Sequence, residues 1–246
     1  MSDQPAVSKD LDLALRAEPQ DEALNSHATS AEAQTADKDQ RLLTIFEIAK
    51  IPATERDLEA MLPKFLSCLI ETLEAAEAGI LLLHDPSDGR LTVRAAQGYD
   101  LTTLRQIRLA PGESMSGKVF QTGQAELYPT PEAIAAAMAN MTPANREMFR
   151  AATIGLRQPL SAIYIPLITG QTKVGVLVLE NRRQPGSFVR ADLPFLQDVA
   201  DLIALSIGNA HLKEELRTEL ALNEANRLKS ELISTLAHEM RTPLTS

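Results

Sequence analysis

The sequence has a single cysteine, which excludes an internal disulfide framework. No apolar run approaches the roughly 20 residues that a membrane-spanning helix needs, so no span is expected. The 24 basic residues form no dense block and are outnumbered by 33 acidic ones, which argues against a nucleic-acid-binding surface. The N-terminus lacks the basic and apolar regions of a signal peptide. These absences predict a cytoplasmic protein with no direct membrane span and no nucleic-acid partner.

Metal-binding patterns are equally scarce, because no group of His, Cys and Asp has metal-ligand spacing. Cys68 lies on the apolar stripe of a predicted helix, and we interpret it as a buried, unreactive thiol. His84 ends a predicted strand, where a haem-ligand role is the alternative to a simple polar strand end. His211 is expected to face solvent on a helix. We therefore predict no metal site.

The 246 residues, of which 44% are apolar, suffice for one domain of ordinary size with extensions. Residues 1–38 contain no aromatic residue and are rich in small and polar types, so we expect a disordered N-terminal tail. Order should begin near residue 41, be interrupted at Pro52, and resume in a helix capped by Thr54. Apolar residues at helical spacing mark this helix: Leu58, Met61, Leu62, Phe65, Leu66, Leu69, Ile70 and Leu73.

Short apolar runs then replace the helical pattern. Segment 78–84 predicts a strand buried on both faces, and 91–98 predicts its hairpin partner across an Asp-Gly turn. Segments 161–167 and 174–181 predict a second hairpin. Between the hairpins, the glycine-punctuated segment 107–127 predicts a loop, a helical turn and a short strand.

Helices are predicted in the rest of the chain. In the Met-rich insertion 129–153, Thr130-Pro131 and Thr142-Pro143 each place a capping residue before a proline at a helix start. A long helix is predicted from Arg190 onward. Together these elements predict an α+β fold, with an antiparallel sheet flanked by helices and followed by a long C-terminal helix.

The order and spacing of four stretches resemble the GAF domain family: "GILLLHDPSDGRLTVRAAQG", "LAPGESMSGKVFQTGQ", "SAIYIPLITGQTKVGVLVLEN" and "SFVRADLPFLQDVADLIALSIGNAHL". The resemblance covers about residues 41–212. It implies a GAF-like sensor domain over residues 39–212, with a pocket for a small-molecule ligand that the sequence does not name.

Asn181, Phe188 and Asp192 are similar to a signature of cyclic-nucleotide-binding GAF domains. Arg182 and Leu193 replace the lysine and the glutamate of that signature. The matching positions are also common structural ones in GAF domains. Cyclic-nucleotide binding and a purely structural role therefore stand as alternatives.

The C-terminal stretch "KSELISTLAHEMRTPLTS" resembles the phosphoacceptor box of sensor histidine kinases. By this resemblance His238 is the phosphoacceptor, Glu239 the acid–base group, and Thr242 the residue that orients water in phosphatase turnover. A neutral imidazole nitrogen is the nucleophile such chemistry needs, and a neighbouring carboxylate fixes its tautomer. The alternative is a solvated His-Glu pair on a surface helix.

The resemblances together imply the N-terminal part of a cytoplasmic two-component sensor histidine kinase. Residues 213–227 would be a helical linker, and 228–246 a truncated phosphoacceptor (HisKA) helix. No glycine-rich phosphate loop or Asn/Asp-x-Gly-x-Gly box is present, so the fragment should be inactive alone and hold no cofactor. ATP and Mg²⁺ would belong to the missing kinase domain.

Partners follow from the same interpretation. Leu205, Leu212 and Leu216 have heptad-like spacing, which predicts a homodimer through the C-terminal helix. A response regulator is the expected phosphoryl acceptor. The alternative function is a non-catalytic GAF module for ligand binding or dimerisation, with a cyclic nucleotide as one candidate ligand.

Overall fold

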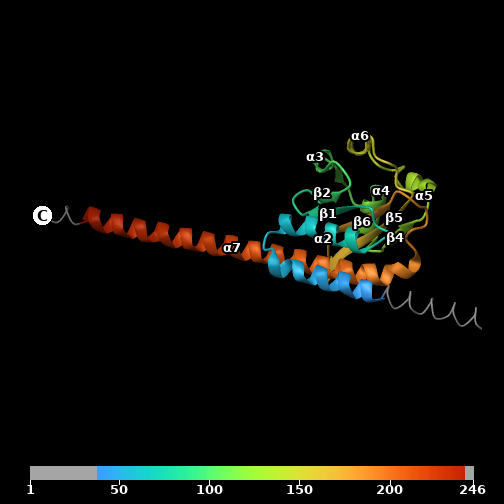
Figure 1. The fold of residues 1–246 in the computed structure, drawn as a ribbon. Helices are drawn as coiled ribbons and strands as arrows, with labels where there is room; N and C mark the ends of the chain where they lie inside the picture. Colours follow the sequence, from blue (N-terminus) through green and yellow to red (C-terminus); the bar gives the residue numbers. More distant parts are fainter. Residues whose placement is uncertain (1–37, 242–246) are drawn as a thin grey trace, which may run out of the picture. The chain divides into compact units, whose positions relative to one another are not determined.

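A computed structural model describes the backbone of residues 38–241 and the side chains as far as Ile233 (Figure 1). Its centre is a six-stranded antiparallel sheet in the order β3-β2-β1-β6-β5-β4. The strands are β1 (Ala78–Asp85), β2 (Arg90–Gln97), β3 (Arg108–Leu109), β4 (Glu126–Tyr128), β5 (Ser161–Thr169) and β6 (Thr172–Asn181). Both predicted hairpins are confirmed, and β1 and β6 form the centre of the sheet.

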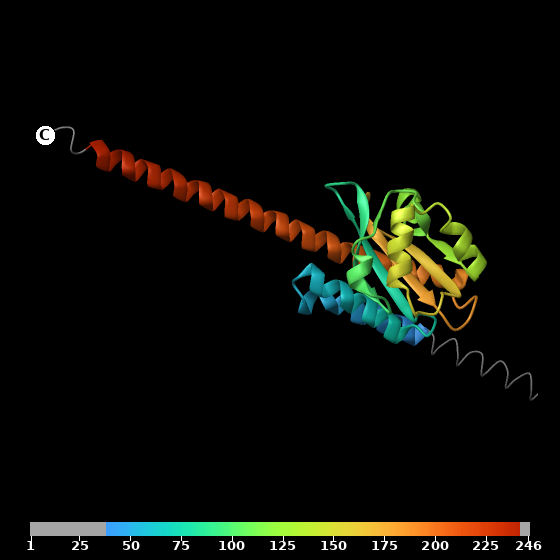
Figure 2. The same cartoon turned by 90° about the horizontal axis from the view of Figure 1, so that it is seen from above.

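Helices cover both faces of the sheet, which confirms the α+β class. They are α2 (Leu58–Thr72), α3 (Leu101–Leu104), α4 (Ser114–Thr122), α5 (Pro131–Ala137), α6 (Pro143–Ala152) and α7 (Leu193–Arg241), with a further helix over 38–54 and the 3-10 turn η1 (Arg190–Asp192). Helices α2 and α7 lie on one face, and α3 to α6 lie on the other (Figures 1 and 2).

Strand alternation divides the core between these two faces. On β6, Val176 and Val178 belong to the apolar cluster beneath α3 to α6. The intervening residues Leu177 and Leu179 are fully buried and point to the face that α2 and α7 cover. Because the sheet is covered on both sides, its central strands are apolar almost throughout.

Two expectations about the first helices are wrong. The helix over 38–54 continues two residues past Pro52, because proline removes only one N–H and this one lies near the helix end. Thr54 does not cap the next helix, since its hydroxyl donates to the carbonyl of Ile51 (3.1 Å). Asp57 is the N-cap of α2 and accepts from the backbone N–H of Ala60 (3.2 Å). Helix α2 runs through Pro63 to Thr72 without a break.

Helices α5 and α6 begin where the Thr-Pro pairs predicted. The hydroxyl of Thr130 accepts from the backbone N–H of Ala133 (3.3 Å), and a proline occupies the first turn of each helix. We call these two helices and their connection, residues 131–152, the lid. Within the lid, α5 contacts β4 and β5, whereas α6 packs on α3.

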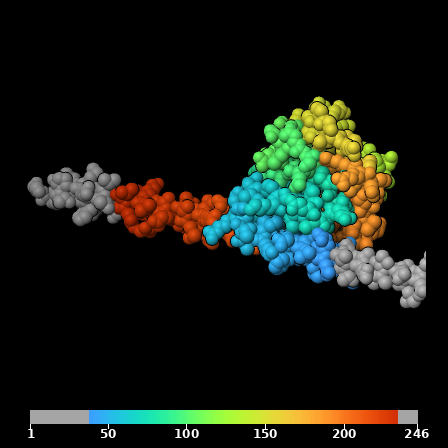
Figure 3. Space-filling model, in the orientation of Figure 1, coloured from blue at the N-terminus to red at the C-terminus, as the bar shows by residue number. Residues whose placement is uncertain are grey.

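Helix α7 is a single element of 49 residues and has two distinct parts. Its first part packs chiefly on β5, and seven apolar residues of this part are buried: Phe195, Leu196, Val199, Ala200, Ile203, Ala204 and Ile207. Residues 211–233 are all exposed, and Figure 3 shows the red atoms of this stretch as a narrow rod. None of the helices in residues 38–241 has an apolar stretch long enough to cross a membrane.

Candidate functional site

A pocket lies between the sheet and the α3–α6 layer. Its volume open to the centres of water molecules is about 40 Å³. Thirteen of its seventeen lining residues are apolar or Pro: Ile80, Leu82, Val93, Leu104, Ile107, Leu109, Met115, Ile134, Met138, Met141, Phe149, Pro159 and Val178. Ser114, Ser116, Tyr164 and Glu180 supply its only polar side chains. Such a mostly apolar pocket with a few polar groups is typical of a small-molecule site.

Glu180 is the only charged residue in the pocket wall and is 2% exposed. The hydroxyl of Tyr99 donates to its Oε2, and the guanidinium of Arg182 lies 3.9 Å from the same oxygen. Burial raises the pKa of Glu180 above its ordinary value, although Tyr99 and Arg182 partly offset this. Arg182 also stacks over the ring of Tyr99, 4.4 Å from its centroid.

Tyr164 is the second polar group at this end of the pocket. Its side chain is 5% exposed, and its ring makes an edge-to-face contact with Tyr128 at 5.5 Å. Burial, followed by the charge of Glu180, raises the pKa of its hydroxyl well above the ordinary value, so the hydroxyl keeps its proton. Among the residues that the structure describes, none forms a hydrogen bond with this hydroxyl.

A buried carboxylate ties the lid to the start of α4. Glu113 is 7% exposed and receives hydrogen bonds from the hydroxyl and backbone N–H of Thr142 and from the amide of Asn145, each at 2.8 Å. The backbone N–H of Ala110 donates at 3.1 Å. Burial alone would raise the pKa of Glu113, but these hydrogen bonds outweigh it and hold the pKa below its ordinary value.

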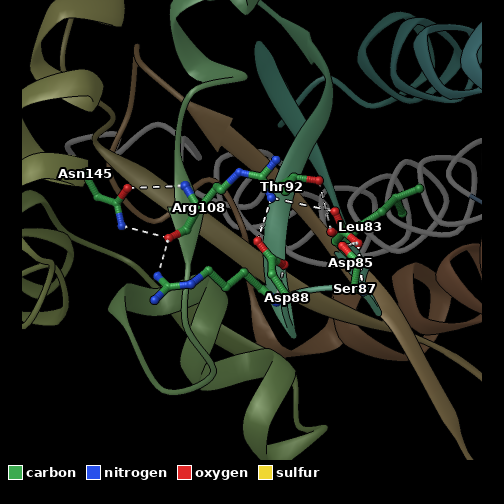
Figure 4. Close-up of polar contacts among 8 residues, drawn as sticks. Leu83, Asp85, Ser87, Asp88, Thr92, Arg108 and Asn145 are labelled. Carbon is green, nitrogen blue, oxygen red and sulfur yellow. Dashed lines mark hydrogen bonds and ion pairs between the residues drawn. The ribbon is translucent and has the colours of Figure 1, made fainter.

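Asn145 also completes the short edge strand β3, as Figure 4 shows. Its side-chain oxygen accepts from the backbone N–H of Arg108 (3.2 Å), and its nitrogen donates to the carbonyl of the same residue (3.0 Å). The guanidinium of Arg108 in turn pairs with Asp88 (2.6 Å) and lies 3.6 Å from Asp85, both near the β1–β2 turn. Asn145 thus acts as a strand partner supplied by the lid.

The loop before α4 is held by a second asparagine. Asn140 accepts from the backbone N–H of Ser114 and donates to the carbonyl of Gly112, both at 2.8 Å. The backbone of Ser114 has a positive φ of 57°, which is a strained conformation for any residue other than glycine. At Gly117 a Cβ would lie 2.4 Å from the carbonyl oxygen of Ala110, so only glycine fits there. These contacts set the pocket wall at Ser114 and Met115.

The residues of the phosphoacceptor motif lie at the far end of α7. His238 and Glu239 are within the helical backbone that ends at Arg241, and Thr242 lies outside the described residues. Their roles as phosphoacceptor, acid–base group and phosphatase residue stay predictions. The domain boundaries at 212 and 227 also stay predictions, because α7 crosses both positions without a break.

The residues that suggested cyclic-nucleotide binding serve the scaffold. Asn181 donates to the carbonyl of Ala75 (2.9 Å) and accepts from the backbone N–H groups of Arg183 and Gln184 (2.9 and 2.8 Å). Asp192 accepts from the backbone N–H of Val189 at 2.9 Å, and Phe188 is 2% exposed in the core. None of the three lines the pocket, so the structural alternative accounts for them.

Cys68, His84 and His211 occupy positions that point to no chemistry. Cys68 is half-buried rather than fully buried, and burial, followed by Glu47 and Glu71, raises the pKa of its thiol. A raised pKa is what an unreactive thiol requires. The ring of His84 stacks on Phe120 at 4.9 Å, and His211 is exposed. No group of three metal-binding side chains occurs in the described part of the chain.

Sequence analysis missed Glu113, Tyr99, Tyr164 and Glu180. One signal was available for Glu180, because it is the only charge in the apolar run 174–180 and falls on the same strand face as Val176 and Val178. For the others no local signal exists, since the partners are far apart in the chain. Tyr99 and Glu180 are separated by 81 residues.

The family follows from comparison with known proteins. The model of the GAF domain matches residues 55–207, well over half of the chain. The chain belongs to the GAF domain family. Its GAF domain therefore comprises α2, the whole sheet, the lid and the first part of α7. GAF domains are sensor modules of signalling proteins, and the pocket lies within the matched residues.

Curated relatives carry this GAF domain within much longer proteins. A Nif-specific regulatory protein of Azospirillum lipoferum is 28% identical over 180 residues, covering 71% of this chain and 27% of that protein. The hybrid signal transduction histidine kinase G of Dictyostelium discoideum is 35% identical over 96 residues, covering 36% of this chain and 3% of the kinase. The chain thus spans about a quarter or less of these relatives' lengths.

Solved structures agree on the fold. The GAF domain of a phosphoenolpyruvate-protein phosphotransferase from Coxiella burnetii has a TM-score of 0.58 and 22% identity, covering 72% of this chain and 97% of that domain. The free methionine-R-sulfoxide reductase of Neisseria meningitidis, solved with its substrate, has a TM-score of 0.53 and 17% identity. The match covers 69% of this chain and 89% of the reductase chain. At these identities the likeness shows the GAF fold alone.

Proposed function

We propose that this chain is the sensory, N-terminal part of a cytoplasmic two-component sensor histidine kinase. Its GAF domain responds to a small-molecule or protein signal and relays the response through α7 to His238. The observation that carries the proposal is the continuity of α7, which packs on the sheet of the GAF domain and runs unbroken to the residues of the phosphoacceptor motif. The partial match to a hybrid histidine kinase supports the same assignment.

Strand β5 is the physical link between pocket and helix. Tyr164 lines the pocket, while its neighbours Ile163 and Ile165 are fully buried on the opposite face of the sheet, where α7 packs. A ligand that shifts Tyr164 therefore acts on the same strand against which α7 is seated. Because packed interfaces respond as units, a small displacement of β5 is transmitted to the start of α7.

The chemistry proposed for His238 is phosphoryl transfer. A neutral imidazole nitrogen attacks the γ-phosphorus of ATP, the bond to the departing ADP breaks, and a phosphoramidate forms. The carboxylate of Glu239 accepts a hydrogen bond from the proton on the other ring nitrogen and stabilises the developing positive charge. ATP and Mg²⁺ are held by the kinase domain, and a response regulator receives the phosphoryl group.

Trans-phosphorylation tests the proposal. The purified chain is mixed with an ATP-binding histidine kinase domain and radiolabelled ATP, and label on the chain is followed with time. We expect label that is acid-labile and alkali-stable, as a phosphoramidate is, and its complete loss in His238→Gln. His211→Gln, an exposed histidine on the same helix, is the matched control and should label normally. Acid-stable label, or label that persists in His238→Gln, would contradict the assignment.

We also propose that the chain forms a homodimer through α7. Large apolar side chains are about half or more exposed along α7 from Leu205 onward: Leu205, Leu212, Leu216, Leu220, Leu222, Leu228, Leu232 and Ile233. Exposed apolar residues in such density on one helix are typical of a helix–helix interface. A second copy of the same helix offers the same exposed leucines, and pairing of the two helices would let two GAF domains act on one pair of phosphoacceptor helices.

A second candidate function is a GAF regulatory module whose histidine is never phosphorylated. The relatives described as Nif-specific regulatory proteins favour it, because their match covers 71% of this chain against 36% for the kinase. The two functions differ in the labelling experiment. A chain that dimerises and binds a ligand but takes no label from any histidine kinase domain would support the regulatory module.

A further inference from the structure

The polar end of the GAF pocket has hydrogen-bonding capacity that the protein itself leaves unused. The hydroxyl of Tyr164, on a side chain that is 95% buried, has no hydrogen-bond partner among residues 38–233. Glu180 accepts from Tyr99 through Oε2, and no donor in the same part of the chain bonds its Oε1. Among the described residues, the only fully buried side-chain nitrogen or oxygen without a partner is Nε of Arg182. The unpaired oxygens of Tyr164 and Glu180 are therefore accessible in the pocket, where a bound molecule can pair with them.

The charges around the pocket restrict what that partner is. Glu180 is the only charged lining residue, and no lysine, arginine or histidine lines the pocket. An anion would therefore meet a carboxyl group whose counter-charge, Arg182, lies outside the pocket wall, which is unfavourable. A cation would lose its hydration on entering the pocket and would pair with a carboxyl that Tyr99 and Arg182 already contact. The attraction to Glu180 would therefore offset little of the desolvation cost.

The wall restricts size and polarity as well. The space open to water centres, about 40 Å³, holds only a few waters. Met115, Met138, Met141 and Phe149 line it from the α4 and lid side, and Met side chains adapt to the shape of an apolar partner. A compact apolar body about the size of one ring therefore matches the cavity.

We propose that the ligand of this GAF domain is a small uncharged molecule with a compact apolar body and a single hydroxyl or carboxamide head group. The head group donates to Glu180 and accepts from the hydroxyl of Tyr164. This inference rests on the proposed sensory function and names the chemical class that the site takes. It assigns specificity to two side chains, Tyr164 for the head group and Glu180 for rejection of anions.

Five probes that share one ring test the head group. Benzyl alcohol, benzamide, benzoate, benzylammonium and toluene are titrated into the 246-residue protein and followed by calorimetry and thermal unfolding. We expect benzyl alcohol and benzamide to bind about tenfold or more tightly than benzoate and benzylammonium. Benzoate or benzylammonium binding as tightly as benzamide would overturn the inference, and so would the absence of binding by both neutral probes.

Three variants assign the contacts. Tyr164→Phe should weaken benzyl alcohol about 3- to 10-fold, the effect of one hydrogen bond, and leave toluene unchanged. Tyr128→Phe is the matched control, because its hydroxyl donates to Glu126 and the residue does not line the pocket. Glu180→Gln should raise the affinity for benzoate relative to benzamide. Equal effects of the two tyrosine variants, or benzoate still excluded by Glu180→Gln, would overturn the assignment.

The outcome is independent of the phosphoacceptor test. If the neutral probes fail while His238 is labelled, the ligand class is wrong and the kinase assignment stands. If the probes bind and His238 takes no label, the ligand class stands within a regulatory GAF module.

Discussion

Two buried glutamates in this domain are stabilised in opposite ways. Glu113 has four hydrogen bonds from Ala110, Thr142 and Asn145, which favour its charged form. Glu180 accepts one hydrogen bond from a tyrosine, and burial favours its neutral form. The carboxylate of Glu113 links the lid to the start of α4 through these hydrogen bonds, and we call this link the clasp. The carboxyl group of Glu180 is held beside an open cavity, which is the position of a recognition group.

Removing the clasp should destabilise the lid. Glu113→Ala leaves Thr142 and Asn145 with unpaired buried donors, so we expect a loss of about 1–3 kcal/mol in the free energy of unfolding. Urea denaturation measures it. Glu147→Ala, an exposed glutamate on the same lid, is the control and should change stability by less than about 0.5 kcal/mol. Equal losses in the two variants would show that the clasp contributes nothing.

Glu180 predicts a pH dependence of stability with a definite sign. Its folded pKa lies above the ordinary value of 4.5, so between these two values the folded state binds more protons than the unfolded state. The free energy of unfolding therefore falls as pH rises through this window. Glu180→Gln should remove that fall, whereas Glu147→Gln should keep it. Denaturant titrations from pH 4 to pH 8 test this, and identical pH profiles for wild type and Glu180→Gln would contradict it.

At the scale of elements, the leucine stripe of α7 changes face along the helix. Leu205, Leu212 and Leu216 lie on one side, but Leu228 follows Leu212 by sixteen residues, which is about 160° round the helix after whole turns. Asn223 and Asn226 lie between the two stripes. One straight seam cannot contain both the first stripe, Leu205, Leu212 and Leu216, and the second stripe, which begins at Leu228. A dimer therefore pairs through one of the two stripes, or the two helices twist around each other between them. Two such pairings offer a signalling helix two states.

Leucine substitutions on α7 test the first stripe. Leu212→Asn should weaken dimerisation about tenfold or more, since it places an amide in the apolar seam. Leu222→Asn is the matched control, because Leu222 is similarly exposed (60% against 65%) but lies about 80° away from Leu212 round the helix. Analytical ultracentrifugation over a concentration range measures both. A monomeric wild type, or an equal effect of both variants, would contradict pairing through this stripe.

At the scale of the molecule, the pocket and the proposed phosphoacceptor His238 belong to elements that share one continuous framework. The pocket lies on one face of the sheet, α7 is seated on the other, and β5 contributes residues to both. Among the side chains described as far as Ile233, Ile207 is the last buried apolar residue of α7, and His238 follows it by 31 residues. A ligand effect on His238 would therefore travel along the helix. Coupling therefore depends on how α7 is packed and paired rather than on contact with the ligand.

Kinetics of phosphoryl transfer test the motif itself. With a kinase domain in trans, Glu239→Gln should slow labelling of His238 by about 10²- to 10⁴-fold, because the imidazole loses its positioned acid–base partner. Thr242→Ala should slow loss of the phosphoryl group more than its gain. The exposed Glu224→Gln on the same helix is the control and should label at the wild-type rate. Unchanged labelling in Glu239→Gln would remove the acid–base role.

The sequence by itself determined the order of the elements and the fold class. Strand alternation, Thr-Pro helix starts and the Asp-Gly turn are local signals, and the structure confirms the elements that they predicted. The errors were local too. At Pro52 and Thr54 a plausible break and cap were displaced by a few residues, since Asp57 competes for the same role with a stronger capping side chain. Family membership also followed from linear motifs.

Only the tertiary structure decided which side chains meet. Glu113 reaches Asn145 across 32 residues of sequence, and Tyr99 reaches Glu180 across 81. The hydrogen bonds that set the pKa values of these groups depend on which strand faces point inward and on how the lid folds back over the sheet. The periodicity of apolar residues in the sequence predicts helices and strands, but it does not predict which remote segments lie close together in the fold. The polar end of the pocket could therefore be identified only from the packing of remote segments, whereas the spacing of apolar residues already predicted helix α7.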